Sequence, residues 1–396
     1  MSDLPLSGVR VVDLTRILSG PFCSMLLGDL GADVVKVEPP GQGDPVRKQG
    51  EIVDGMSWYF AGFNRNKRSL ALDLRSDDGR EVLAKLLARA DILTENFRPG
   101  VLSEMGFTPE RLSEINSDLI VVSVNGYGSS GPYATRPAFD FITQAMSGFM
   151  ATNGTPETGP IRTAPPITDL VAGLYAALGA VAALRGREAG GPAQAVEASM
   201  MMSMMSMLAY LSSNALANGR DPVPTGNDHP IASPYGLFRA SDGHIAVAPS
   251  TEVIVRRFLG ALDLSHLLDD PRFSDNAARL ENRAALNRMI DEVVSTDAQS
   301  VWIERLNAAG VPCGRVQTLT EALSDPQTEA QEMVLRVEHP GHGKVGMTGF
   351  PIKFSKTPLR PRHPAPDLGA QGADVLREAG IDDATIVTLR EAGILG

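Results

Sequence analysis

The sequence predicts an α/β protein, with a Rossmann-like large domain built on a parallel sheet and a smaller α+β domain. Three observations support this prediction. Short apolar strands alternate with helices along the first 130 residues, a segment rich in proline and glycine divides the later chain, and strand and helix signals mix beyond it. Buried strands separated by helices of this length pair in parallel through right-handed crossovers.

Five apolar segments are expected to form strands of this sheet: 9–14, 32–38, 69–74, 91–96 and 119–128. Helices are predicted between them at 21–32, 77–90 and 109–118, where apolar residues recur at helical spacing. The first strand is followed by TRILSGP rather than by a GxGxxG fingerprint, and the sequence contains no GxxxxGK[ST] phosphate loop. These absences argue against a dehydrogenase or an ATPase.

Two buried helices are predicted next, at 169–185 and about 197–216, the second because its methionine-rich stretch is apolar almost all round. Residues 216–234 read as a linker, and 235–249 as a hairpin that turns at SDG. Helices are expected through about 251–324, short strands from 331, and closing helices at the end. The predicted domains are therefore 1–215 with 330–396, and 235–325.

Composition narrows the function classes. A chain of 396 residues is long for one core, which agrees with two domains. Its net charge of −11 argues against general binding to nucleic acid or to a membrane surface. Cys23 and Cys313 lie far apart and are expected to be buried residues of a reducing compartment. The N-terminus lacks signal-peptide features, and the longest apolar stretches are too short or too interrupted for a bilayer, so a cytoplasmic protein is expected.

Asp169 is the first candidate for chemistry, in the stretch TAPPITDLVAGLY where a proline-containing loop gives way to an apolar helix. Either Thr168 or Asp169 is expected to cap the free N–H groups of that helix. The helix dipole is expected to keep the carboxylate ionised at neutral pH. An ionised carboxylate facing an apolar pocket is a competent nucleophile toward an activated acyl group. The alternative is that Asp169 is only a structural cap.

Several segments, taken in order over nearly the whole chain, carry a family resemblance. They include GVRVVDLTRILSGPFCSMLLGDLGADVVKVEPPGQGDPVR (8–47), FNRNKRSLALDLR (63–75), DILTENFRPGVLSEMGF (91–107) and ITDLVAGLYAALGAVAAL (167–184). The chain resembles the family III CoA-transferases (the CaiB/BaiF family), which include formyl-CoA, carnitine and succinyl-CoA:hydroxymethylglutarate CoA-transferases. The resemblance implies an interlocked homodimer. The run NRNK and the turn EHPGHGKV look most similar to the succinyl-CoA:dicarboxylate type.

The resemblance also implies site residues. Asp169 occupies the nucleophile position, where an aspartyl anhydride and then an aspartyl-CoA thioester would form. Coenzyme A is implied as part of an acyl-CoA substrate, not as a permanently bound cofactor, and a carboxylic acid is the implied acceptor. The implied CoA contacts are Leu18, Ser19, Leu72, Asp73, Leu74, Arg75, Asn96, Phe97, Arg98 and Arg136. Lys67 and Arg68 are further candidates for the anion, and Arg16, Asp140 and His229 for the acceptor acid.

Two positions depart from the formyl-CoA transferase pattern, because Pro39 and Glu104 stand where that enzyme has arginines. A 2-methylacyl-CoA racemase is the alternative enzyme of the same fold, and it needs a histidine where this chain has Phe139. A catalytically silent acyl-CoA-binding protein is the non-enzyme alternative. No metal site is predicted, since His339 and His342 lie in a stretch whose proline and glycine indicate a turn.

Overall fold

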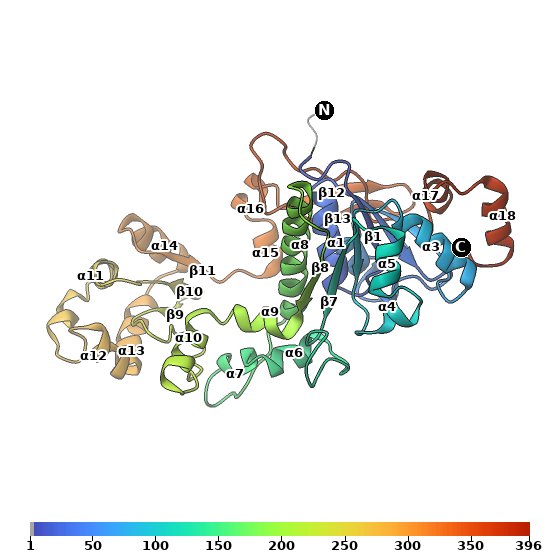
Figure 1. Cartoon of the computed structure of the whole chain (residues 1–396). Helices are drawn as coiled ribbons and strands as arrows, with labels where there is room; N and C mark the ends of the chain where they lie inside the picture. The colour runs from blue at the N-terminus through green and yellow to red at the C-terminus, as the bar shows by residue number, and fades with distance from the viewer. Residues whose placement is uncertain (1–3) are drawn as a thin grey trace. The chain divides into compact units, whose positions relative to one another are not determined.

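The computed structural model describes residues 4–396, which divide into two compact units (Figure 1). The first unit contains the chain up to Phe149, then Arg162–Ser212 and Pro326–Gly396. The second contains Met150–Ile161 and Ser213–Asp325. The segment Met150–Ile161, which the sequence placed in the large domain, therefore belongs to the second unit.

A six-stranded parallel sheet forms the centre of the first unit. Its strands are β1 (Arg10–Asp13), β2 (Asp33–Glu38), β5 (Lys67–Ala71), β6 (Ile92–Glu95), β7 (Ile120–Asn125) and β8 (Ala195–Ser199), in the order β5-β2-β1-β6-β7-β8. Counted along the chain this order is 3-2-1-4-5-6, which is the Rossmann arrangement. The five predicted strands are all present, and β8 is a sixth that the sequence did not predict.

Helices cover both faces of the sheet (Figure 1). The apolar side chains of α1 (Ser19–Asp29) and α8 (Ile167–Glu188) pack on one face with residues such as Val11, Val34 and Ile120. The opposite face is covered by α3 (Asp77–Leu87), α5 (Pro109–Ile115), α17 (Gly372–Glu378) and α18 (Asp383–Glu391). Helices α17 and α18 come from the end of the chain, which returns to complete this layer.

Helix α8 is the one described helix long and apolar enough to span a membrane. Half of its apolar window is buried, and its alanines pack in the core against α1 and the sheet. Gly173 lies tightly against α1. A Cβ added there would lie 2.5 Å from the carbonyl oxygen of Ser19 and 3.1 Å from the ring of Phe22. Only glycine allows the two backbones to come this close, so α8 is a core helix.

The predicted helix at 197–216 is wrong in its extent. The segment opens with β8, continues as α9 (Met200–Ser206) and resumes as α10 (Ala209–Asn218). Ala209 has a φ of 50°, which breaks the helix. The residues just before the methionine run, Ala195–Ser199, therefore complete the parallel sheet beside β7.

Shorter elements finish the first unit. These are the 3-10 turn η1 (Pro45–Lys48), β3 (Ile52–Val53), β4 (Met56–Ser57), α2 (Trp58–Asn64), α4 (Val101–Glu104), α6 (Asp140–Met146), α16 (Pro326–Ala330), β12 (Val334–His339) and β13 (Gly343–Thr348). The β12–β13 hairpin packs on α2 through a small core that includes Phe60, Val345 and Met347. Helix α7 (Phe149–Thr152) lies at the junction of the two units.

The second unit has its own core around Phe238, Phe258 and Trp302. Its antiparallel sheet contains β9 (Gly236–Ala240), β10 (Gly243–Val247) and β11 (Cys313–Arg315), and the hairpin turns at the predicted place. The helices are α11 (Glu252–Ala261), η2 (Ser265–Asp269), α12 (Asn276–Glu281), α13 (Arg283–Val294), α14 (Gln299–Ala308) and α15 (Leu319–Leu323). Cys313 is only half-buried here, whereas Cys23 in the first unit is fully buried.

Candidate active site

Two cavities lie in the first unit, beyond the carboxyl ends of its parallel strands. One, of about 420 Å³, is lined by residues that include Ser19, Asn96, Arg136 and Asp169. The other, of about 500 Å³, is lined by the segments that follow β1, β2 and β5. Arg16, Pro45 and Phe97 line both cavities, so the two are neighbours. Ligands of open α/β sheets bind at this edge, where the strand order reverses between β1 and β6.

Asp169 lies in the first turn of α8 and faces the smaller cavity. The expectation that Thr168 or Asp169 caps this helix is wrong, since no side chain of the N-cap residue, Pro166, does so. The cap comes instead from Asp140, whose Oδ1 accepts hydrogen bonds from the Thr168 amide and hydroxyl, each at 2.9 Å. Asp169 is thus left with a side chain that is not used for capping.

Asp140 begins α6, and its second carboxylate oxygen accepts a hydrogen bond of 2.7 Å from Gln144 Nε2. Gln144 in turn accepts a hydrogen bond from the Thr163 amide at 3.0 Å. These contacts place a second negative charge close behind Asp169. Asp140 was predicted to contact the acceptor acid, whereas the contacts described here are with the start of α8.

The pKa of Asp169 is raised to about 7, first because the carboxyl is buried and then because of the charge on Asp140. A hydrogen bond from the Ser19 side chain lowers it in part. The expectation that the helix dipole keeps Asp169 fully ionised is therefore wrong: burial and a like charge outweigh the dipole. A pKa near 7 leaves about half of the groups ionised at neutral pH and makes the carboxylate more basic than an ordinary aspartate.

Tyr59, in α2, is a neighbour of this pair that no local sequence signal singles out. Its pKa is raised to about 12, chiefly by burial and then by the charges of Asp169, Asp44 and Asp140. The phenol therefore stays protonated across the physiological range. Its place on an aromatic helix, WYFAGFN, reads as ordinary core packing, and only the fold brings it near the carboxylates.

Ser19, in the first turn of α1, lies beside Asp169 and lines the same cavity. The N–H groups of Leu18, Ser19 and Gly20 have no acceptor among residues 4–396. Gly20 cannot carry a side chain, since a Cβ there would lie 2.4 Å from that of Thr15. Three amides at a helix N-terminus form a site of positive potential for developing negative charge. Leu18 itself is buried, so its contribution to the site is its backbone.

The candidate CoA contacts divide between the two cavities. The segment Leu72–Arg75 lines the larger one, together with Pro39 and Glu104, the two positions that depart from the formyl-CoA transferase pattern. Asn96, Phe97, Arg98 and Arg136 line the smaller one. The Arg75 side chain is 90% exposed and pairs with Asp73 at 2.9 Å. The Arg136 guanidinium lies 3.9 Å from the ring centroid of Tyr133.

Asn96 uses its side-chain amide on the protein itself. Its Oδ1 accepts from the Arg16 amide at 2.9 Å, and its Nδ2 donates to the Arg16 carbonyl at 2.7 Å. The Arg16 guanidinium lies 5.9 Å from the ring centroid of Phe97, and no described carboxylate forms an ion pair with it. Arg16 is thus an available cation on the walls of both cavities. His229 belongs to the second unit, where its ring lies 4.7 Å from that of Tyr235.

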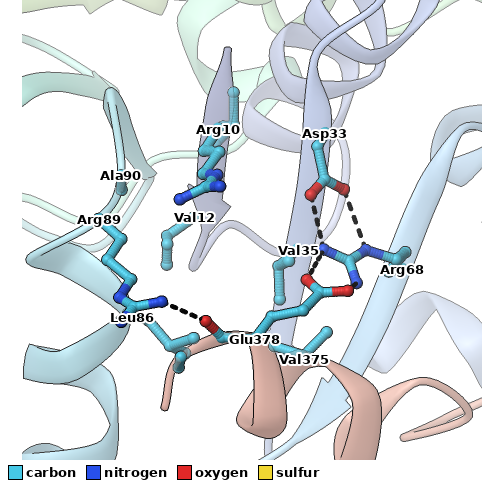
Figure 2. A pocket seen from close by; sticks show the side chains of 12 residues that line it. Arg10, Val12, Asp33, Val35, Arg68, Leu86, Arg89, Ala90, Val375 and Glu378 are labelled. Carbon is cyan, nitrogen blue, oxygen red and sulfur yellow. Dashed lines mark hydrogen bonds and ion pairs between the residues drawn. The ribbon is translucent and has the colours of Figure 1, made fainter. Parts of the chain in front are cut away.

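Lys67 and Arg68 do not face these cavities. Lys67 is fully buried, and its ammonium binds Asp13 at 3.1 Å and Asn64 at 2.9 Å. Arg68 lies at the other edge of the sheet, beside a cavity of about 60 Å³ (Figure 2). There its guanidinium is held between Asp33 at 2.6 Å and Glu378 at 2.8 Å. The suggestion that these two cations bind the anionic substrate is therefore wrong, because both are already paired.

His339 and His342 lie at the β12–β13 turn, as their surrounding proline and glycine predicted. Together with Asp367 they bring three potential ligand atoms within 4.8 Å of one another. His342 Nε2 lies 2.9 Å from Asp367, and its other ring nitrogen lies 2.5 Å from the Asp54 carbonyl. His339 Nδ1 accepts from the Gly341 amide at 3.0 Å, so the proton of its neutral form is on Nε2. With its Nε2 protonated and its Nδ1 accepting a hydrogen bond, His339 has no free lone pair to offer a metal ion shared with His342 and Asp367.

Comparison with known proteins agrees with this geometry. The model of CoA-transferase family III matches residues 6–372. The chain belongs to CoA-transferase family III. An acetyl-CoA:oxalate CoA-transferase of Acetobacter aceti is 36% identical, over 96% of this chain and 97% of that one. A succinyl-CoA:glutarate CoA-transferase of Homo sapiens is 34% identical, over 99% and 90%.

Solved structures agree with the fold of this family III protein. A CaiB/BaiF family protein from Brucella suis superposes with a TM-score of 0.85 at 36% identity, over 96% of this chain and 100% of that one. A protein from Mycobacterium tuberculosis superposes with a TM-score of 0.84 at 26% identity, over 94% and 99%. The mixed α/β architecture with a central parallel sheet is therefore that of the family.

Proposed function

We propose that this family III enzyme moves CoA from succinyl-CoA to a carboxylic acid, with Asp169 as a covalent nucleophile. The observation that supports this most directly is the position of Asp169 in a cavity wall beside Ser19, in a helix start that carries three unpartnered amides. Its raised pKa adds nucleophilicity, while enough of the ionised form remains at neutral pH. Coenzyme A takes part as a substrate thioester and is not retained between turnovers.

The first half of the reaction transfers CoA to the protein. The Asp169 carboxylate attacks the thioester carbonyl of the donor, the C–S bond breaks, and CoA leaves as a thiolate while a mixed anhydride forms. The thiolate then attacks the aspartyl carbonyl of the anhydride. Its C–O bond breaks, the donor acid leaves as a carboxylate, and an aspartyl-CoA thioester remains. The amides of Leu18, Ser19 and Gly20 would stabilise the oxyanion formed at each step.

The second half repeats these steps in reverse with a new acid. The acceptor carboxylate attacks the aspartyl-CoA carbonyl, which releases the CoA thiolate and forms a second anhydride. The thiolate attacks the acceptor carbonyl of that anhydride, and the product thioester leaves together with the free Asp169 carboxylate. Every step exchanges one acyl bond for another of similar energy, so no ATP is required.

Incubation with succinyl-CoA followed by hydroxylamine or borohydride tests the covalent intermediates. The peptide that contains Asp169 should become modified only after the acyl-CoA is added. An unmodified Asp169 peptide in an enzyme that still turns over would contradict the mechanism, while leaving the family assignment unchanged.

The acceptor is proposed to be a C4–C6 dicarboxylate. The curated relatives include a succinyl-CoA:mesaconate CoA-transferase from Haloarcula hispanica, 36% identical over 96% of this chain and 98% of that one. Arg16 offers an unpaired guanidinium at the cavity for the second carboxylate. Removing the Arg16 guanidinium weakens the binding of a substrate with a second carboxylate more than that of one without it.

Crossing a panel of CoA thioesters with short mono- and dicarboxylates, read by mass spectrometry, tests this assignment. The Arg16→Ala variant should raise the acceptor KM more than the donor KM. Arg10→Ala, at the opposite edge of the sheet, is the matched control. A preference for acetate or butyrate, or equal acceptor KM values in both variants, would contradict the dicarboxylate proposal.

Racemisation is disfavoured by the residue next to Asp140. Phe139 is 67% exposed and lines the smaller cavity. A phenyl ring carries no exchangeable proton, so it cannot serve as the base that a 2-methylacyl-CoA racemase needs. Incubation with 2-methylacyl-CoA in deuterated water should therefore give no α-deuterium uptake above background.

A cytoplasmic homodimer, interlocked as the family resemblance implies, is also proposed. Apolar side chains of α8 and α9, including Leu174, Leu178, Met202 and Met205, are exposed in the single chain. A second copy would cover such a surface, since soluble monomers seldom expose clustered large apolar residues. Sedimentation equilibrium of the wild type and of Leu178→Asp tests this proposal, and a monomeric wild type would contradict it.

A further inference from the structure

The loop Thr15–Ile17, between β1 and α1, is held almost entirely by side chains from elsewhere in the fold. The Thr15 amide donates to Asp13 at 2.9 Å, and Asn96 holds both backbone groups of Arg16. The remaining contacts come from a buried pair. Lys36 Nζ donates to the Thr15 carbonyl at 2.7 Å, and the Ile17 amide donates to both Asp44 oxygens at 3.1 and 3.2 Å.

Ile17 needs such a hold because its backbone is strained. Its φ is 70°, in the left-handed region that β-branched residues rarely adopt. A residue in this region persists only where its surroundings fix it. Asp44 does so from a distance of 27 positions in sequence, and its Oδ1 also accepts from the Val46 amide, which anchors the carboxylate in its own turn.

Lys36 and Asp44 form an ion pair of 2.9 Å whose side chains are 0% and 1% exposed. A buried ion pair is weak evidence for stability, because removing two charges from water offsets much of their attraction. Both partners also contact the loop, on either side of Arg16. Such a pair therefore fixes one loop conformation more effectively than it stabilises the fold.

The conformation of this loop determines where the first turn of α1 points. The loop runs directly into Leu18, Ser19 and Gly20, which carry the unpartnered amides, and Ser19 lies beside Asp169 in the cavity wall. Asp169 is on a different helix, α8, which is fixed against α1 four residues later, at Gly173. The Ser19 carbonyl packs on Gly173, so a change in the loop would turn the first-turn amides about that contact while the carboxylate stays on α8.

We propose that Lys36 and Asp44 are positioning residues for the transfer reaction. They hold Ile17 in its left-handed conformation and so keep the α1 amides aimed at the oxygen of the acyl group that reacts with Asp169. Neither side chain touches the reacting atoms. The inference rests on the proposed role of Asp169 as nucleophile.

The test compares Lys36→Met and Asp44→Asn with a matched pair at the far end of α1. Each variant should lower kcat by about 10- to 100-fold, since a misaimed oxyanion donor costs on this order. The KM for succinyl-CoA should change by less than about 3-fold, because the cavity walls remain. Asp29→Asn and Arg65→Met break an equally buried ion pair of 2.6 Å that does not contact the loop, and their kcat should change little.

Rescue by glycine separates positioning from general loss of stability. Glycine adopts a φ of 70° without strain, so Ile17→Gly added to Asp44→Asn should recover at least 5-fold of the lost kcat. Failure of that recovery in a folded double variant would overturn the inference. So would equal kcat losses in the Lys36 and Arg65 variants at matched thermal stability.

If Lys36→Met does not fold, the pair of Asp44→Asn with and without Ile17→Gly decides the question alone. Failure of the nucleophile proposal would be visible separately, as an active Asp169→Asn variant or an unmodified Asp169 peptide. The loop result is read from the kcat difference and its rescue, which depend on no trapped intermediate.

Discussion

The charged groups at the two edges of the parallel sheet are arranged differently: they are paired with opposite charges at one edge, and like charges lie together at the other. At the amino ends of β1, β2 and β5, Arg68 is neutralised by Asp33 and Glu378 around a small cavity (Figure 2). At the carboxyl ends, Asp169 lies beside Asp140 and has a strongly raised pKa, and Ile17 is strained. Charges that satisfy one another stabilise the fold, whereas unfavourable groups gathered at one edge identify a functional site.

The largest effect is expected from Asp169→Asn, which should remove transfer activity. The free energy of unfolding, by contrast, should increase at neutral and alkaline pH. The folded pKa of about 7 lies above the ordinary 3.8, so ionisation of Asp169 destabilises the fold as pH rises from about 4 to 7. The variant should therefore be more stable than the wild type at pH 8, by up to about 4 kcal/mol, and equal to it below pH 4.

Denaturant titration at pH 4 and pH 8, with activity measured alongside, checks both parts. Loss of activity with lower stability at pH 8 would mean that the carboxylate is a structural cap. In that case the charged groups at both edges of the sheet would serve to stabilise the fold.

The next effect concerns the contact that joins α8 to α1. Gly173→Ala would place a Cβ 2.5 Å from the Ser19 carbonyl and push the helices apart. Stability should fall by about 1–3 kcal/mol, and kcat by roughly 10- to 100-fold, because Asp169 moves away from the α1 amides. Gly186→Ala is the matched control on the same helix, where an added Cβ meets nothing within 4 Å. Equal losses of stability and kcat in the two variants would contradict the explanation by a close contact at Gly173.

The pH profile tests the charge behind Asp169. For the wild type, kcat/KM for the donor should rise with pH and level off above about 7. In Asp140→Asn the midpoint should shift to lower pH, since the like charge that raises the Asp169 pKa is gone. Initial rates between pH 5 and 9 measure both profiles. An unchanged midpoint would mean that burial alone raises the pKa of Asp169.

The smallest effect is expected at the amino edge. Arg68→Met should lower stability by about 1 kcal/mol, since its two partners are partly exposed. Transfer activity should stay within a factor of two. Thermal unfolding and kcat under standard conditions are sufficient to check this. A large loss of kcat would mean that the functional region extends to the amino edge of the sheet.

Sequence reasoning predicted the sheet well, because buried parallel strands are continuous apolar runs that one segment reveals by itself. It missed β8, where Ala195–Ser199 has only intermediate apolar character and gains its place from β7. It also assigned Lys67 and Arg68 to the substrate. Their pairing with Asp13, Asp33 and Glu378 depends on residues up to 310 positions away.

Within the site, the position of Asp169 was predictable and its electrostatics were not. A lone acid after a proline-containing loop is a local signal, but its pKa depends on Asp140 and on burial, which only the tertiary fold determines. The same holds for the Thr15–Ile17 loop. Nothing in TRILSGP indicates that Asp44 and Lys36 would bind its backbone.

The two cysteines have a practical consequence for detecting free coenzyme A, which hydrolysis of a thioester releases and transfer does not. Burial raises the pKa of Cys23 to about 12 and also raises that of Cys313. Both protein thiols are therefore less ionised near pH 8 than a free thiol in water, whose pKa is about 8.5. Because the thiolate is the reactive form, a chromogenic disulfide should react with coenzyme A that hydrolysis liberates well before it modifies the enzyme. Hydrolysis of a thioester, as a side reaction of transfer, can thus be followed continuously in the native protein.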